Sequence, residues 1–240
     1  MPAWNRPDHV PFPHTWHTFQ ARDPTAADDR LINYRVQDLP PERAEDAVRH
    51  MCTYFLKDEP ICRSLKLVDD PVGVREMSLV WAKVARQRCA VVCFREGSDE
   101  IVGLNMLTVV SREDDASSGS KFESPAVRDF VDSTLYMTDQ GKLFETYEVD
   151  CFLSAWGLSV HPTYRGLGIS TEIIRARIPF CRQFGLKLSA TVFSHPGSQV
   201  PAAKVGFQDA VVIRFVDLAN QGYRLAVPVE YNKLMVLKVE

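Results

Sequence analysis

The sequence predicts an α/β fold in which helices flank a twisted central sheet of about seven strands. Apolar runs of strand length alternate with longer stretches in which apolar residues recur at helical spacing. The 240 residues are 45% hydrophobic and 25% charged, a composition that favours a folded chain with a sizeable core. The sequence contains no internal repeat and no low-complexity segment. We therefore expect one domain over residues 31–240, preceded by an N-terminal extension over residues 1–30.

Strand and helix patterns alternate through the first half of this domain. A strand is predicted at 31–37, helices at 42–57 and 72–88, and a hairpin from strands at 89–95 and 101–111. The first helix is amphipathic because its apolar residues share one face, namely Ala44, Val48, Met51 and Phe55. Residues 96–99, with the sequence Glu-Gly-Ser-Asp, have the composition of a turn between the two hairpin strands.

The second half begins with a charged, serine-rich loop at 112–120. A helix at 122–137 precedes a strand at 151–160, and a second helix covers 171–184. Strands at 187–193, 208–218 and 231–239 complete the predicted sheet.

The extension over residues 1–30 is rich in Pro, His and Asp and lacks the pattern of a signal or transit peptide. It contains four aromatic residues, Trp4, Phe12, Trp16 and Phe19. Two alternatives remain open for this segment: it is disordered, or it packs over the domain.

A turn that contains Gly166 and Gly168 lies between the strand at 151–160 and the helix at 171–184. The first turn of a helix leaves backbone N–H groups without partners, and glycines allow a phosphate to approach them. Neither a third glycine nor a Gly-Lys-Ser/Thr ending follows, which excludes the dinucleotide fingerprint and the P-loop. The following helix is basic, with Arg175, Arg177 and Arg182. The turn indicates either a pyrophosphate site or an ordinary strand-to-helix turn beside a solvated basic face.

The pattern Val-x-Pro-x-Tyr-Arg-Gly-x-Gly-Ile at 160–169, followed by Lys-x-Gly-Phe at 204–207, resembles the GCN5-related N-acetyltransferase superfamily. Thr163 departs from the Gln or Arg usual at its position. The resemblance implies a mixed sheet splayed in the middle and a site for acetyl-coenzyme A, used as a co-substrate. The residues that it places at this site are Leu158, Ser159, Val160, Arg165, Gly166, Leu167, Gly168, Ile169, Ser170 and Lys204.

Residues 52–60, with the sequence Cys-Thr-Tyr-Phe-Leu-Lys-Asp-Glu-Pro, resemble a segment of the insect-type arylalkylamine N-acetyltransferases, of which the dopamine N-acetyltransferases are members. This resemblance implies that Glu59 is the general base, with Ser194 and Ser198 as further catalytic residues. Tyr54, Phe55, Tyr136 and Phe144 are candidates for the amine pocket, although such aromatic residues are more often core. The competing interpretations are an exposed helix end at Glu59 and a helix cap at Ser194.

The family implies acetyl transfer from acetyl-coenzyme A to a small arylalkylamine, such as dopamine, tyramine, octopamine or serotonin. An alkylammonium group with a pKa of ~10.4 is neutral in less than about one molecule in a thousand at pH 7, so this reaction needs a positioned base. Three alternatives stay open: agmatine or a polyamine as the acceptor, a different acyl-coenzyme A as the donor, or coenzyme A binding without efficient turnover.

Bulk properties favour small-molecule partners. The formal net charge of −3 argues against nucleic acid as the main partner, and no apolar run reaches the length of a membrane span. The six cysteines form no CxxC pair and no zinc-type set with histidines, which indicates free thiols and no metal site. We expect a cytoplasmic monomer.

Overall fold

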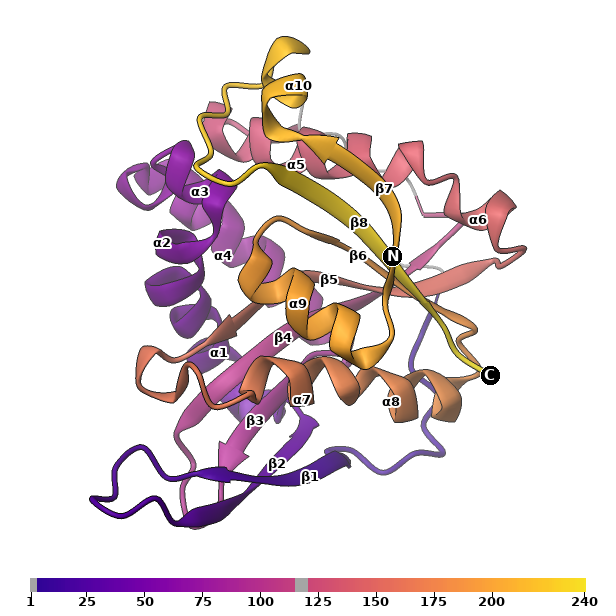
Figure 1. Ribbon diagram of the computed structural model, residues 1–240. Helices are drawn as coiled ribbons and strands as arrows, with labels where there is room; N and C mark the ends of the chain where they lie inside the picture. The colour runs from indigo at the N-terminus through magenta and orange to yellow at the C-terminus, as the bar shows by residue number, and fades with distance from the viewer. Residues whose placement is uncertain (1–3, 115–120) are drawn as a thin grey trace.

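The computed structural model describes residues 4–114 and 121–240. Its centre is an eight-stranded sheet with the strand order β1-β2-β3-β4-β5-β6-β8-β7, and neighbouring strands are antiparallel except β5 and β6 (Figure 1). The strands are β1 (Thr15–Arg22), β2 (Leu31–Asp38), β3 (Val91–Arg95), β4 (Ile101–Ser111), β5 (Cys151–Val160), β6 (Leu188–Phe193), β7 (Gln208–Arg214) and β8 (Tyr231–Lys238). The predicted mixed α/β sheet is confirmed, and β3 and β4 form the expected hairpin.

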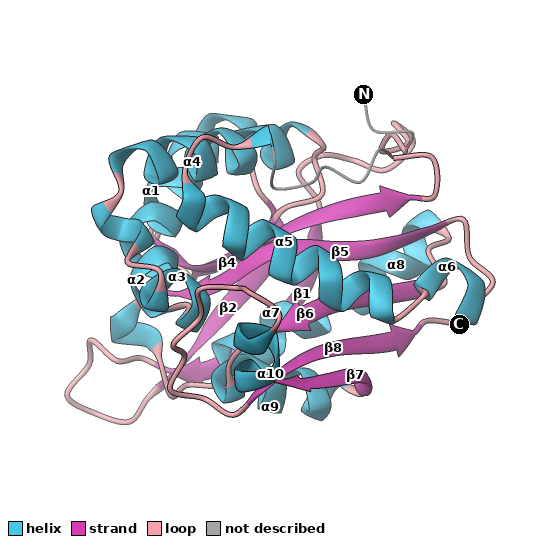
Figure 2. Ribbon diagram, turned by 90° about the horizontal axis from the view of Figure 1, so that it is seen from above, coloured by secondary structure: helices cyan, strands magenta, loops and turns pink. Residues whose placement is uncertain are grey.

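Helices cover both faces of the sheet (Figure 1, Figure 2). One face packs on α1 (Ala44–His50), α4 (Pro71–Arg86) and α5 (Pro125–Gln140), and the opposite face packs on α7 (Ile169–Arg175) and α8 (Arg177–Phe184). A third, smaller core lies under α9 (Pro196–Val205). Each face therefore has its own hydrophobic core, because both sides of the central strands are apolar.

Shorter elements connect these helices. Between α1 and α4 they are the π-helix η2 (Met51–Phe55), α2 (Leu56–Asp58), α3 (Pro60–Ser64) and the 3-10 turn η3 (Leu67–Asp69). The others are η1 (Pro41–Arg43), α6 (Leu143–Thr146), η5 (Pro162–Tyr164) and α10 (Phe215–Asn220).

The N-terminal segment supplies the edge strand β1, which accounts for the eighth strand. Asp38, at the end of β2, is fully buried and accepts two hydrogen bonds from Arg6, at 2.9 and 2.7 Å. The same carboxylate accepts bonds from the backbone N–H of His14 and from Nε1 of Trp16. Over residues 4–30, this buried ion pair and the strand pairing hold the segment against the sheet.

Two predicted elements have different boundaries in the structure. The strand predicted at 208–218 ends at Arg214, and α10 follows it, so this part of the prediction is wrong. Phe215 and Leu218 are both buried, a spacing of three that suits a helix, and Arg214 pairs with Asp217 over the same interval. The helix predicted at 171–184 is divided at Ala176 into α7 and α8. Most of the loop predicted at 112–120 lies outside the described residues.

Strands β5 and β6 separate along most of their length. Leu153 opposite Ser189 is the one residue pair recorded between them in the described chain. On its other side β5 pairs with β4 and carries a bulge, in which Trp156 and Gly157 stand opposite the single residue Met106. Gly157 has φ of 119°, a conformation that favours glycine. The splay predicted for the middle of the sheet is thus present, and the bulge lies beside it.

Candidate functional site

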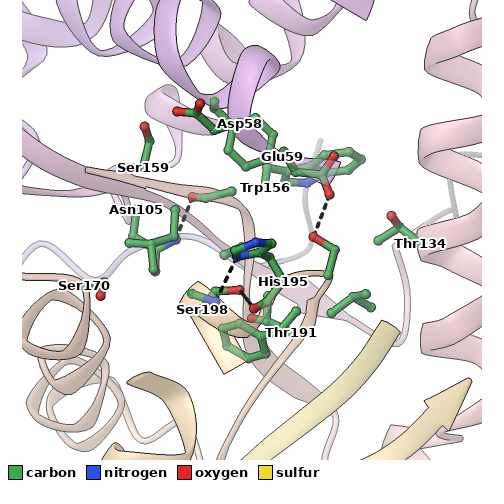
Figure 3. Close-up of a pocket in the computed structure, with 18 of the residues that line it drawn as sticks. Asp58, Glu59, Asn105, Thr134, Trp156, Ser159, Ser170, Thr191, His195 and Ser198 are labelled. Carbon is green, nitrogen blue, oxygen red and sulfur yellow. Dashed lines mark hydrogen bonds between the residues drawn. The ribbon is translucent and has the colours of Figure 1, made fainter. Parts of the chain in front are cut away.

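A cavity of about 510 Å³ lies at the splay between β5 and β6 (Figure 3). Its walls come from α2 and α3, the cavity-facing side of α5, the bulge of β5, the glycine turn before α7, and the start of α9. Most of its lining is apolar. Aromatic residues contribute much of that surface, namely Phe55, Phe130, Phe152, Trp156, Tyr164 and Phe193.

Glu59 lies in the wall of this cavity, where the chain leaves α2 and enters α3. Its backbone is extended because Pro60 follows, and its side chain caps α3 by accepting a hydrogen bond from the backbone N–H of Cys62, at 2.6 Å. The other carboxylate oxygen accepts a 2.6 Å bond from the Ser194 hydroxyl, drawn as the dashed line from Glu59 in Figure 3. Glu59 is only 8% exposed, and the part of the chain that the structure describes records no cation paired with it.

The two predicted serines point to different partners. Ser194 follows β6 and reaches Glu59, which lies 135 residues earlier in the chain. Ser198 donates instead to the backbone carbonyl of His195, at 2.9 Å, within the first turn of α9. His195, rather than Ser194, caps this helix, since its side chain accepts from the N–H of Gly197. Both serines line the cavity, but only Ser194 is bonded to the carboxylate.

The glycine turn faces the same cavity. Gly166 and Gly168 have φ of 77° and 80°, and an added Cβ at either position would meet no atom within 4 Å. The backbone here is therefore open to a ligand. Arg165 bridges to Asp58 at 2.5 Å and to the carbonyl of Val160 at 3.1 Å, which fixes the turn against α2.

Eight of the ten residues predicted for the coenzyme site line the cavity: Leu158, Ser159, Val160, Arg165, Gly166, Gly168, Ile169 and Ser170. Leu167 is not among the lining residues and packs on the core beneath the turn. Lys204 is exposed in the last turn of α9, outside the cavity lining.

Side chains anchor the bulge of β5 from two directions. The indole N–H of Trp81, on α4, donates to the carbonyl of Trp156 at 2.8 Å. Asn105, on β4, donates to the carbonyl of Gly157 at 2.7 Å. Since the N–H and C=O of a trans peptide point in opposite directions, these bonds also fix the direction of the N–H groups of Gly157 and Leu158.

The predicted amine-pocket residues do not come together. Phe55 lines the cavity, whereas Tyr54, Tyr136 and Phe144 are absent from its lining. Tyr54 packs on the rings of two histidines, Tyr136 accepts a hydrogen bond from the amide of Gln221, and Phe144 packs on Phe152. Three residues that the sequence does not single out line the cavity instead, namely Phe130, Thr134 and Trp156. Phe130 and Thr134 are four residues apart, so the helical pattern at 122–137 already placed them on one face.

Two buried basic residues that the sequence does not single out lie at the cavity: His50 is beside it, and Arg177 is part of its wall. His50, on α1, lies 3.1 Å from the Ser159 hydroxyl through its Nε2 atom. Burial, together with the nearby His161 and Arg165, lowers the pKa of His50 to about 4, so its ring is neutral near pH 7. The sequence predicts that Arg177 lies on a basic helix face, but this residue is fully buried. The signal was available, because Arg177 is three or four residues from Ile173, Ile174, Phe180 and Cys181, all buried.

The remaining chemistry of the described residues is simple. All six cysteines are free thiols. Within residues 4–114 and 121–240, no group of three or more His, Cys, Asp or Glu side chains is arranged to hold a metal ion, and no helix is long and apolar enough to span a bilayer.

No family model matches the sequence. The structure is nevertheless similar to those of insect acetyltransferases. A candidate arylalkylamine N-acetyltransferase 7 from the yellow fever mosquito Aedes aegypti is 47% identical, with 99% of this chain and 100% of that chain covered and a TM-score of 0.94.

Two further structures share the fold. Arylalkylamine N-acetyltransferase 2 from Aedes aegypti is 17% identical over 86% of this chain and 99% of that chain, with a TM-score of 0.76. A polyamine N-acetyltransferase from Drosophila melanogaster is 14% identical over 86% of this chain and 100% of that chain, with a TM-score of 0.72. The identity of 47% with the arylalkylamine N-acetyltransferase 7 structure, over 99% of this chain, establishes the family. This chain belongs to the insect arylalkylamine N-acetyltransferases of the GCN5-related N-acetyltransferase superfamily.

Proposed function

We propose that this protein transfers the acetyl group of acetyl-coenzyme A to the primary amine of a small arylalkylamine, by direct attack in a ternary complex with Glu59 as general base. The observation that carries the proposal is the buried Glu59 carboxylate in the wall of the cavity, bonded to Ser194 and without a cationic partner in the described chain. A buried carboxylate within reach of a bound amine is the arrangement that general-base catalysis requires.

The donor's pyrophosphate fits the glycine turn, where Gly166, Gly168, Ile169 and Ser170 line the cavity beside Arg165. Backbone N–H groups at the start of a helix are a common phosphate site. The pantetheine arm fits the splay, because the backbone of β5 beyond Leu153 lacks a β6 partner in the described structure. Leu158, Ser159 and Val160 are the proposed backbone contacts. An N–H group of the anchored bulge would then stabilise the thioester oxygen, a role typically worth about 3 to 4 kcal/mol.

In the transfer step, the lone pair of the amine nitrogen forms a bond with the thioester carbon. The carbon–sulfur bond breaks, and its electron pair stays on sulfur as a thiolate. The amine's surplus proton passes to Glu59, directly or through water, and the thiolate gains a proton near neutral pH. Glu59 can serve as base and as helix cap together, because its two oxygens have different partners.

The lining of the cavity favours an aryl monoamine over a diamine. Aromatic rings from α5 and the bulge, Phe130 and Trp156, join Phe55 in a largely apolar wall. The acids among the described lining residues are Asp58 and Glu59, and Asp58 is already paired with Arg165. A diamine such as agmatine or a polyamine would need a second free carboxylate for its distal charge. Dopamine, tyramine, octopamine and serotonin are therefore the first amines to test.

Replacing Glu59 by Gln tests the base. We expect Glu59→Gln to lower kcat/KM for amine acetylation by about 10²- to 10⁴-fold and to change its pH profile between pH 6 and 9. A matched control exists in Asp70, which caps α4 by accepting from the N–H of Val72 and also accepts a serine hydroxyl, that of Ser124. Asp70→Asn removes a capping carboxylate with the same kind of partners away from the cavity, so acetylation should stay near the wild-type rate.

A near wild-type rate for Glu59→Gln across this pH range would contradict the base assignment. Thiol release with a panel of amines tests the activity itself. Coenzyme A binding without release for any amine would indicate a binding protein, and saturable activity on aliphatic diamines alone would displace the aryl assignment.

A further inference from the structure

Arg177 is a fully buried cation at the splay. It occupies the first position of α8, beneath the point where β5 and β6 separate, and it belongs to the wall of the cavity. Its guanidinium donates to the Asn105 side-chain oxygen from Nε and Nη2, at 3.0 and 2.7 Å. Nη1 donates to the hydroxyls of Thr191 and Ser189, at 2.7 and 3.5 Å. These partners come from β4 on one side of the splay and from β6 on the other.

All of these partners are neutral. The ion pairs of the described chain include none that joins an acid to Arg177, and its other neighbours are the rings of Phe193 and Phe207, 5.8 and 5.7 Å away. The titratable neighbour is Cys181, one turn along α8, and burial raises its pKa to about 12, so it stays a neutral thiol near pH 7. A buried cation normally has an anionic partner, because its desolvation is expensive.

Asn105 connects this charge to the bulge. Its oxygen accepts from Arg177, and its amide nitrogen donates to the carbonyl of Gly157, at 2.7 Å. The cation therefore holds the Asn105 amide in one orientation, and Asn105 holds the bulge on which the donor's reactive end would lie.

We propose that Arg177 stabilises the departing sulfur of coenzyme A as a thiolate through its uncompensated positive charge. Asn105 and Thr191 hold its guanidinium beneath the splay. The inference rests on the proposed function. When the carbon–sulfur bond breaks, both bonding electrons remain on sulfur, and the amine's proton leaves toward Glu59. The anion that a buried arginine normally has as a permanent partner is, in this view, formed at the site during each turnover.

The test uses the complex of the whole protein with coenzyme A, without an amine. The thiolate is followed by its ultraviolet absorbance during a pH titration, and free coenzyme A is the reference. An opposite charge ~4–6 Å away lowers an acidic pKa by about 1 to 3 units, and for a cation in the cavity wall we expect the lower end, about one unit. A bound thiol that titrates at or above the pKa of the free thiol would overturn the proposal.

Two substitutions at one position assign the effect to Arg177. Thr191→Asp places a carboxylate where Arg177 already donates a hydrogen bond, whereas Thr191→Asn has a similar shape and no charge. Neutralising the cation in place avoids the unpaired Asn105 and Ser189 that an Arg177→Met substitution would leave. Relative to Thr191→Asn, we expect Thr191→Asp to raise the bound thiol's pKa by about one unit and to lower kcat at least tenfold, with KM for the amine little changed.

Equal thiol pKa values and equal kcat in the two variants would show that Arg177 has only a structural role, since an added ion partner would not weaken a structural contact. Calorimetric titration of the wild type with coenzyme A separates this failure from failure of the proposed function. If the wild type does not bind coenzyme A, the proposed function is wrong. If it binds, but the titrations of the two variants coincide, only the role of Arg177 is wrong.

Discussion

In the bulge of β5, adding a single methyl group at Gly157 is predicted to destabilise the folded protein. An alanine Cβ at this position would lie 2.7 Å from the Met51 methyl and 2.7 Å from Cε2 of Phe55. The backbone φ of 119° is itself unfavourable for alanine, at about 1–3 kcal/mol. Overpacking adds about 1–3 kcal/mol, reduced here because the Met51 side chain can move while the Phe55 ring is held. We therefore expect Gly157→Ala to lower the free energy of unfolding by about 2–4 kcal/mol.

Gly97 provides the matched control. It also has a positive φ, of 72°, and an added Cβ there would meet no atom within 4 Å. Gly97→Ala should thus show the conformational term alone, about 1 kcal/mol. Equilibrium urea unfolding, followed by circular dichroism, measures both variants against the wild type. If the two variants lost the same free energy of unfolding, the close contact of the added methyl group with η2 would contribute nothing.

Two other predictions concern Arg6 and His50, two buried titratable residues outside the cavity lining. Arg6→Met should lower the free energy of unfolding in urea by about 3–5 kcal/mol and expose the segment before β2 to limited proteolysis, because the buried Asp38 carboxyl would lose its cationic partner. An unchanged midpoint would show that the segment is held by β1 pairing alone. The pKa of His50 is about 4 in the folded protein, against an ordinary value of 6.5, so the unfolded state binds more protons between pH 4 and 6.5. The free energy of unfolding should therefore fall by on the order of 3 kcal/mol as the pH drops from 6.5 to 4. His50→Gln should lose that part of the pH dependence, and an unaltered slope would assign the effect to other groups.

Features of the site that adjacent residues determine could be predicted from the sequence. Features that depend on contacts between distant residues could not. The glycine turn is read from adjacent residues, because φ values such as those of Gly166 and Gly168 are a local requirement. The bond between Glu59 and Ser194 joins residues 135 positions apart, and only the family resemblance placed both in one site. The aromatic character of a residue does not tell in which direction its side chain points. The sequence therefore placed Tyr136 and Phe144 in a pocket, whereas Phe130 and Trp156 line the cavity.

Arg177 shows a different limit of sequence reasoning. Its neighbours in the sequence, Arg175 and Arg182, suggested one basic face, but successive helical residues are about 100° apart, so Arg175 and Arg177 point to different sides. The apolar spacing around Arg177 predicted burial, while its charge predicted exposure. Arg177 is fully buried, as the apolar spacing predicts.

The charges of the cavity match the charges that the proposed reaction creates. Acyl transfer to an amine leaves a proton at the nitrogen and an electron pair on the sulfur. Glu59 and Arg177 both lie in the cavity wall, and neither has a partner of opposite charge in the described chain, whereas the more exposed Asp58 and Arg165 neutralise each other. In an ion pair, the attraction between Glu59 and Arg177 would have offset part of the desolvation penalty of both groups. Keeping them apart leaves one charge for the amine end and one for the sulfur end. Two substitutions should therefore impair different steps: Glu59→Gln, which removes the carboxylate charge, should impair proton removal, and Thr191→Asp, which neutralises Arg177 in place, should impair departure of the thiolate.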